Sequence, residues 1–181
     1  MLLSIQQRYI LEAMRKLGCM RRDQLLILTR ERFRRSDLII SERRMEAMLR
    51  QLRNGVADFR LEGDLVTCTQ ALPNAQRLEA IDVMLELTGG TPLDFQGRLR
   101  HPLLLQFTWE QAPGSIRPVT VANLPPAEQG RMERLEQYRR ARVVWLCGDN
   151  RLPEDLSLPQ KHFIAIRKAD GLHVFYGSNG L

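Results

Sequence analysis

A small set of side chains in the stretch 42–54 could make specific contacts with a polyanion. The set recurs at intervals of three or four residues, which places its members on one face of a helix. It consists of Arg43, Ala47, Arg50 and Asn54. Each guanidinium could donate two parallel hydrogen bonds to a guanine edge or to a phosphate, and the small alanine between them would allow close approach. The spacing therefore predicts a helix that reads DNA in the major groove. The alternative is an ordinary solvated helix face, since exposed arginines are common.

The opposite face of the same segment is apolar, which predicts how the helix would be held. Its apolar residues fall within about a hundred degrees of the helix circumference. They are Met45, Met48, Leu49 and Leu52. Ser41 is a good N-cap and Glu42 suits the first turn, so we expect a helix over residues 42–53. Ser41 and Arg44, which flanks the basic face, complete the candidate DNA contacts of this segment.

Basic residues outside this helix extend the candidate DNA-binding surface. Arg21 and Arg22 stand at the start of a predicted helix over 22–32, where a backbone phosphate would be met. Arg60 lies near the tip of a predicted hairpin. That tip, Glu62-Gly63-Asp64, is acidic, and phosphate would repel its carboxylates. Either the hairpin tip is not used for DNA, or the domain binds something else.

The elements that must position these residues are predicted by hydrophobic periodicity within residues 1–70. The spacing of apolar residues is helical up to Gly55 and alternates from there on. Helices are expected over 4–17, 22–32 and 42–53, and strands over 38–40, 56–61 and 65–69. Three helices, a short strand and a terminal hairpin form the layout of a winged helix-turn-helix domain. The alternatives are a small helical domain without a nucleic-acid partner and a winged helix that docks a protein.

Residues 75–181 are predicted to form a second, α/β domain, separated from the first by the junction Ala71-Leu72-Pro73-Asn74. The mixture of elements predicts an α+β class for the chain. Helices are expected over 75–88 and 126–140, and strands over 103–109, 116–122, 142–147, 163–167 and 173–176. The segment 91–101 is expected to be a loop. The order helix, strand, strand, helix, strand resembles a restriction-endonuclease-like core.

The second domain lacks the side chains that such a nuclease would need. That site requires an acidic residue on one strand and a Glu-x-Lys pair on the next, to hold Mg²⁺ and polarise water. The strand 116–122 has neither a carboxylate nor a lysine, and Asp94 and Glu110 have no lysine close in sequence. His162 and His173 are too far out of register to share a metal ion, and no phosphate loop or nucleophile elbow is present. We expect a degenerate, non-catalytic domain with no metal site and no cofactor. A metal-dependent nuclease is the alternative that strand order alone supports.

Charge and composition agree with this division. The chain has 27 Lys and Arg against 21 Asp and Glu, a net charge of +6. Residues 1–70 hold 14 basic and 9 acidic groups, and residues 71–181 hold 13 and 12, so the excess charge lies with the predicted DNA contacts. Three cysteines without metal-ligand spacing indicate reduced thiols. No apolar run approaches the ~20 residues of a membrane span or forms a signal peptide. We expect a cytoplasmic protein with no membrane association.

This architecture resembles that of replication-relaxation-type proteins of bacterial plasmids and integrative elements. The segments that carry the resemblance are the Ile10-to-Leu17 stripe, the Leu25-Leu26 helix, Ser41 through Leu52, and Val143-Val144-Trp145-Leu146. The resemblance implies a non-catalytic DNA-binding regulator, or an accessory factor for replication, transfer or transcription of a mobile element. The expected partner is double-stranded DNA, bound by a homodimer because one winged helix rarely supplies enough specificity. The alternative is a protein-interaction adaptor that uses the winged helix as a docking module. The second domain could also hold a protein partner.

Overall fold

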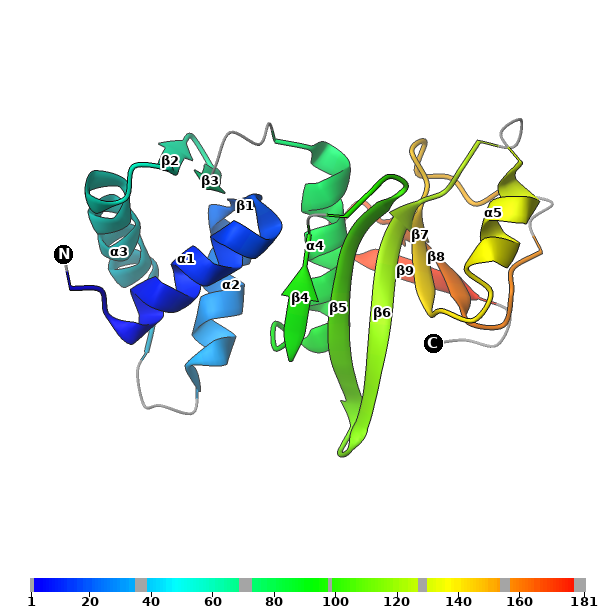
Figure 1. Cartoon of the computed structure of the whole chain (residues 1–181), viewed down its shortest axis with the longest axis horizontal. Coiled ribbons are helices and arrows are strands. Elements are labelled where there is room, and N and C mark those ends of the chain that lie inside the picture. The colour runs from blue at the N-terminus through cyan, green and yellow to red at the C-terminus, as the bar shows by residue number, and fades with distance from the viewer. Residues whose placement is uncertain are drawn as a thin grey trace. The chain divides into compact units, whose positions relative to one another are not determined.

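The computed structural model describes residues 2–34, 39–68, 73–97, 99–126, 130–153 and 157–177. It contains both helices and sheets, which confirms the predicted α+β class. The chain divides into two compact units, Met1–Thr91 and Pro92–Leu181, each with its own β-sheet (Figure 1). Within the described ranges, no helix has the length and apolar character needed to cross a bilayer.

Four helices of the first unit form where the sequence predicts them. They are α1 (Ile5–Leu17), α2 (Arg22–Arg32), α3 (Glu42–Gly55) and α4 (Ala75–Thr88). Side-chain caps fix where three of them begin. The hydroxyls of Ser4 and Ser41 and the side-chain oxygen of Asn74 each accept a hydrogen bond from a backbone N–H of the first turn. The four helical predictions are therefore confirmed, with small shifts at the helix ends.

A three-stranded antiparallel sheet completes the first unit, and one strand is not where the sequence predicts it. In sheet order β1-β3-β2, the strands are β1 (Cys19–Arg21), β3 (Leu65–Cys68) and β2 (Phe59–Glu62). The predicted hairpin is confirmed. The predicted strand over 38–40 is wrong, because Ile39 and Ile40 belong to no strand and Leu38 lies outside the described residues. The first strand instead follows Gly18, whose φ of 84° ends α1 and turns the chain into β1.

The apolar stripes of the helices form the core of the first unit with the sheet. On α1, the residues Ile10, Met14 and Leu17 have no exposed surface. On α3, the whole predicted stripe of Met45, Met48, Leu49 and Leu52 is buried, as predicted. Phe59 of β2 and Val66 of β3 are buried on the strand side. Because this stripe holds α3, the opposite face of the helix is left to solvent.

Helix α4 belongs to the first compact unit. It contacts α2 and β1 and buries Ala80, Ile81 and Met84. The units therefore divide after Thr91 rather than at the predicted junction 71–74. Ala71 and Leu72 of that junction lie outside the described residues. The apolar face of the helix that follows the junction covers α2 and β1, which precede it.

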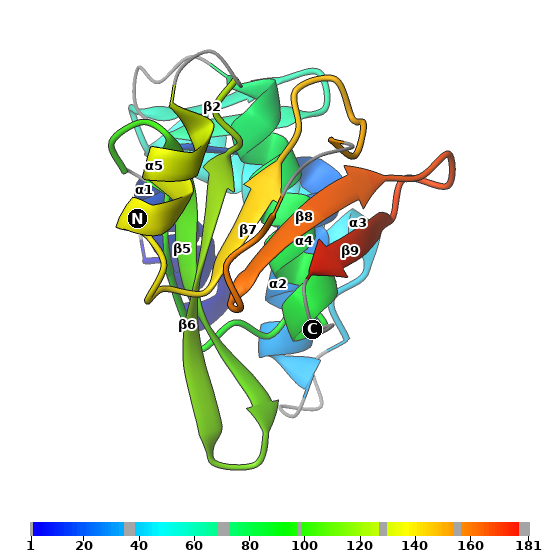
Figure 2. The ribbon, with the colours of Figure 1, turned by 90° about the vertical axis from the view of Figure 1, so that its right-hand side faces the viewer.

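The second unit is a six-stranded mixed sheet with one short helix (Figure 2). In sheet order, the elements are β4 (Asp94–Gln96), β5 (Leu103–Ala112), β6 (Ser115–Asn123), β7 (Val143–Leu146), β8 (His162–Arg167) and β9 (His173–Gly177), with the helix α5 (Arg131–Gln137) between β6 and β7. The strands β6, β7 and β8 run parallel, and the other neighbours are antiparallel.

Two predictions for this unit need correction. The segment 91–101, predicted as a loop, contains β4, which pairs with β5. The predicted helix 126–140 is reduced to α5 among the described residues, while 127–129 lie outside them. The helix is short because this charged segment buries only Leu135 and so offers little apolar surface to hold further turns. The five predicted strands of this unit all form, with shifted ends.

A hydrogen-bonded histidine lies inside the core of the second unit. His162 and Trp145 are both fully buried. Nε1 of Trp145 donates to Nδ1 of His162 at 3.2 Å, so Nδ1 carries no proton, and Nε2 donates to the carbonyl oxygen of Tyr138 at 3.0 Å. Burial lowers the pKa of His162, and the hydrogen bond to Tyr138 and the charge of Glu136 offset this only in part. The site therefore holds the neutral imidazole.

We expect the second unit to lose stability as the pH falls through about 6.5, the usual pKa of histidine. The pKa of His162 in the folded chain is below that value, so the unfolded chain takes up the proton first and acid favours unfolding. In His162→Gln, the amide can keep both hydrogen bonds but does not titrate, so this part of the pH dependence should vanish. Denaturant unfolding between about pH 5 and pH 8, followed by tryptophan fluorescence, measures the effect because both tryptophans lie in this unit. The exposed His101→Gln is the matched control, and an unchanged profile in His162→Gln would contradict the assignment.

Candidate nucleic-acid interface

The exposed face of α3 brings together the residues that the sequence singled out. All of its predicted contact residues are exposed to solvent. They are Arg43, Arg44, Ala47, Arg50 and Asn54. The hydroxyl of Ser41 accepts from the backbone N–H of Arg44 at 3.3 Å, so this serine caps the helix, although it is exposed as well. A row of guanidiniums on a capped and anchored helix can pair with phosphates or with base edges.

One of the two acidic side chains of α3 is paired away from this row. Glu46 of α3 accepts from Arg22 of α2, with Oε1 and the guanidinium nitrogen 2.6 Å apart. Within the described residues, the guanidiniums of Arg43, Arg44 and Arg50 form no ion pair with a carboxylate. The pairing of Glu46 with Arg22 therefore leaves α3 with a positive outer face.

Arg22 holds the two helices of the predicted helix-turn-helix together. Its side chain is half-buried between α2 and α3, and its Nε is buried without a hydrogen-bond partner. Its backbone N–H donates to the carbonyl oxygen of Asp64 at 2.9 Å, which ties the start of α2 to the β2–β3 turn. The structure thus gives Arg22 a partner inside the protein, whereas the sequence predicted contact with phosphate.

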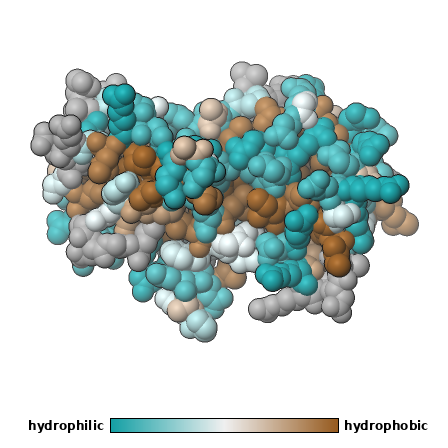
Figure 3. Space-filling model, turned by 180° about the vertical axis from the view of Figure 1, so that it is seen from behind, coloured by the Kyte–Doolittle hydropathy of each residue, from teal (hydrophilic) through white to brown (hydrophobic). Residues whose placement is uncertain are grey.

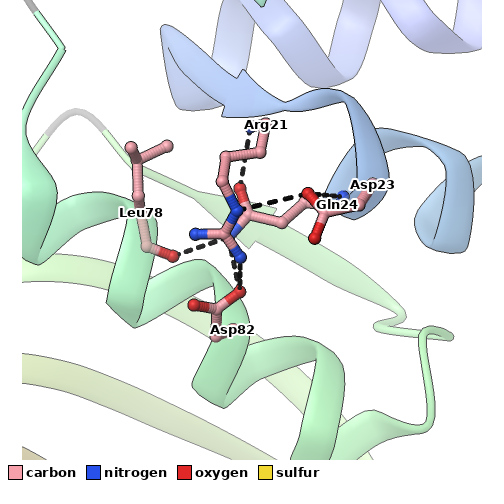
Figure 4. A network of polar contacts seen from close by, with 5 residues as sticks. All are labelled: Arg21, Asp23, Gln24, Leu78 and Asp82. Atoms are coloured by element: carbon pink, nitrogen blue, oxygen red, sulfur yellow. Dashed lines mark hydrogen bonds and ion pairs between the residues drawn. The ribbon is translucent and has the colours of Figure 1, made fainter. Parts of the chain in front are cut away.

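Arg21 is engaged in a second internal network, which Figure 4 shows. Its guanidinium pairs with Asp82 of α4 at 2.5 Å and with Asp23 at 3.2 Å. The side-chain oxygen of Gln24 accepts from the backbone N–H of Arg21 at 2.9 Å. The amide nitrogen of Gln24 donates to Asp82 and to the carbonyl oxygen of Leu78, both at 2.7 Å. These contacts join β1, α2 and α4.

The electrostatics of Arg21 agree with an internal role. Burial lowers the pKa of Arg21, but the hydrogen bond and the attraction of Asp82, together with Asp23, outweigh burial and raise the pKa above its usual value. One feature of the sequence indicates this network. Asp82 is an acidic residue in a predicted amphipathic helix between the apolar residues Ile81 and Val83. A half-buried carboxylate in such a place needs a cation, and Arg21 supplies it.

The β2–β3 hairpin carries both signs of charge. Arg60 is exposed on β2, where its backbone pairs with Thr67. Glu62 and Asp64 are exposed at the tip, and Gly63 between them takes the positive φ of 59° that the tight turn requires. The structure therefore places Arg60 and the acidic tip on the same hairpin, as the sequence predicted, and the tip itself offers a phosphate only negative side chains.

Asp94 and Glu110 are the carboxylates of the second unit that were candidates for catalysis. In the described part of the chain, neither belongs to a group of side chains that could bind a metal ion. Within that part of the chain, no three His, Cys, Asp or Glu side chains are placed so that they could share a metal ion. Glu110 accepts from the backbone N–H of Gly114 at 2.9 Å and so stabilises the β5–β6 turn. Asp94 lies on β4 opposite Thr108.

Replacing Asp82 with Asn should lower the free energy of unfolding of the first unit by about 1–3 kcal/mol. The change would leave the half-buried guanidinium of Arg21 without its principal counterion, while keeping the size of the side chain. Thermal unfolding followed by far-ultraviolet circular dichroism measures the loss. The matched control is Glu62→Gln on the exposed hairpin, which should change stability by less than about 0.5 kcal/mol. Equal melting of Asp82→Asn and the unaltered chain would show that the network contributes nothing.

No family model, curated protein or solved structure matches this chain. Its function must therefore be inferred from its own residues and from their geometry.

Proposed function

We propose that the first unit is a winged helix-turn-helix domain that binds double-stranded DNA, with α3 as the helix that enters the major groove. The observation that carries the proposal is the outer face of α3, where Arg43 and Arg50 are exposed with Ala47 between them. Both arginines project opposite a fully buried stripe, so a groove can be reached without disturbing the core. Because Arg22 neutralises Glu46, this face can approach phosphates without repulsion from that carboxylate.

The order of elements supports the same domain type. Helix α1, strand β1, helices α2 and α3 and the β2–β3 hairpin follow one another, and β3 lies between β1 and β2. This is the arrangement expected of a helix-turn-helix with a hairpin wing. In it, Arg44 and Asn54 flank the central contacts, Ser41 holds the start of the reading helix, and Arg60 is the one basic side chain of the wing strands. Arg21 and Arg22 position these elements from within.

The second unit is proposed to be a degenerate restriction-endonuclease-like domain that does not catalyse a reaction. Three successive antiparallel strands, β4 to β6, lead through α5 to the parallel strand β7, which supports that comparison. Strand β6 carries neither a carboxylate nor a lysine. The whole chain would then act in the cytoplasm as a homodimeric regulator, or as an accessory factor for replication or transfer of a plasmid or integrative element. None of the three cysteines forms a disulfide, which suits that compartment.

One observation favours a second candidate function. The tip of the wing is acidic, with Glu62 and Asp64 both exposed. Such a tip suits a basic partner surface better than a phosphate backbone. The alternative is therefore a protein-interaction adaptor that uses the winged helix as a docking module.

Arg43→Ala and Arg50→Ala should each weaken binding to duplex DNA by about 1–3 kcal/mol. Neither should change the free energy of unfolding by more than about 0.5 kcal/mol, because both side chains are exposed on a helix that tolerates alanine. Fluorescence anisotropy with mixed-sequence duplexes at two salt concentrations measures the affinity. Arg15→Ala on α1 is the control, since it removes the same charge from another exposed helix position. If the two α3 variants bind as the control does, α3 is not the reading helix, and absence of binding at low salt would remove the proposal.

The double variant Glu62→Lys/Asp64→Lys tests whether the wing lies beside bound DNA. If the wing lies beside the DNA backbone, the new charges should tighten binding and steepen the dependence of log K on log salt by about two. The interaction of Arg22 with the turn involves only the backbone carbonyl of Asp64, so the fold should persist. The same titration measures the change. An unchanged affinity and slope would show that the wing points away from DNA.

A further inference from the structure

A basic hollow lies on the second unit, and none of the residues discussed for DNA binding lines it. Its volume is about 330 Å³. It is lined by side chains that include Gln106 of β5, Arg117 and Thr120 of β6, and Arg140, Arg142 and Lys161. A second hollow of about 580 Å³ shares Arg140 and Lys161 with the first and adds Arg139. The two hollows therefore adjoin, and each has several cations in its lining.

The sheet topology explains why these cations meet. Strands β6, β7 and β8 are parallel, so the residues that lead into β7 and β8 lie side by side (Figure 2). They lie along the edge of the sheet that the N-terminal ends of these strands form. The carbonyl oxygen of Arg142 accepts from the N–H of Thr120, and that of Lys161 accepts from the N–H of Val143. Arg117 comes from the β5–β6 hairpin, whose surface is mainly hydrophilic where it projects at the bottom of Figures 1 and 3.

The cations at this edge have no carboxylate partner in the part of the chain that the structure describes. Within the described residues, no carboxylate forms an ion pair with Arg117, Arg140, Arg142 or Lys161. Among the described residues that line the hollows, the one carboxylate is that of Glu136, and it pairs with Arg139 at 3.7 Å. Burial, and then repulsion from Arg117, lower the pKa of Arg142, so a bound anion would relieve a cost that the fold now carries.

Arg142 is fixed in place as part of this surface. Its guanidinium lies over the ring of Phe163, 5.7 Å from the ring centroid, and its side chain is half-buried. Arg117 is steadied by a hydrogen bond from its Nε to the hydroxyl of Ser115 at 3.3 Å. Arg117, Arg140 and Lys161 are exposed and can reach a large partner. The cluster therefore combines an anchored cation with accessible ones.

We propose that this edge of the second unit is a second nucleic-acid contact, which binds the phosphate groups of a DNA backbone without reading its sequence. The described residues that line the two hollows include no aromatic ring, so bases have no stacking platform and contacts to phosphate remain. The cations spread over two adjoining hollows suit successive phosphates of a strand better than one small anion. The proposal does not depend on the role of α3.

The test uses the full chain carrying Arg43→Ala/Arg50→Ala, so that any contribution of α3 is reduced. Addition of Arg117→Ala/Lys161→Ala should raise the Kd for a mixed-sequence duplex at low salt by about tenfold or more and lower the salt slope by about two. The matched control adds Arg100→Ala/Arg151→Ala, which removes two exposed charges of the same unit outside both hollows. Equal affinities of these two variants would overturn the proposal.

A second measurement distinguishes a strand from a small phosphorylated ligand. Isothermal titration of the same full-length variants with inorganic pyrophosphate should show much weaker binding than the duplex does. Binding of pyrophosphate that depends on Arg117 and Lys161, without binding of the duplex, would overturn the assignment to a DNA backbone. Far-ultraviolet circular dichroism should show an unchanged fold in every variant, because the substituted side chains are exposed.

Discussion

The pairing of two half-buried arginines with two carboxylates is the interaction on which the arrangement of the first unit depends. An arginine that leaves water needs a hydrogen-bonded counterion, because desolvation of an uncompensated charge is expensive. Asp82 meets this need for Arg21, and Glu46 meets it for Arg22. Since Arg21 lies in β1 and Asp82 in α4, the first pair ties α4 to elements that precede it by some sixty residues, while Gln24 joins α2 to the same cluster. The second pair ties α2 to α3. Two adjacent residues, Arg21 and Arg22, thereby fix the positions of four elements relative to one another.

The same pairs decide which charges the unit offers to a partner. Arg21 and Arg22 are paired inside the unit, so they add little to the charge that the unit offers a partner. On α3, Glu46 is paired with Arg22, and Arg43 and Arg50 remain exposed to solvent. In the proposed function, Arg22 acts as a positioning residue: it fixes α3 against α2 and shields the reading face from Glu46 without touching DNA.

Local pattern predicted the four helices of the first unit well, because an amphipathic helix repeats its signal over several turns. The stripe from Met45 to Leu52 is buried as the spacing indicates, and the exposure of Arg43 and Arg50 follows from it. The strands β1 and β4 were missed because each has three residues, too few for an alternation to be visible. They exist only through pairing with distant strands: Cys19 lies opposite Thr67, and Asp94 opposite Thr108. The membership of α4 in the first unit and the partner of Arg21 were missed for the same reason, since a helical pattern shows that a face is apolar but not what it covers.

In both units the fold brings together charged side chains from separate parts of the chain, but with opposite results. In the first, residues of opposite charge converge from distant parts of the chain and cancel. In the second, residues 92–181 hold 12 basic and 9 acidic groups, and Arg117, Arg142 and Lys161 meet at one edge. They meet because parallel strands must be entered from the same end, so the residues that precede β7 and β8 become neighbours whatever their charge. The place where charge gathers on this unit therefore depends on the topology of its sheet. Composition gives the excess of positive charge in this unit, but only the strand order shows where that charge gathers.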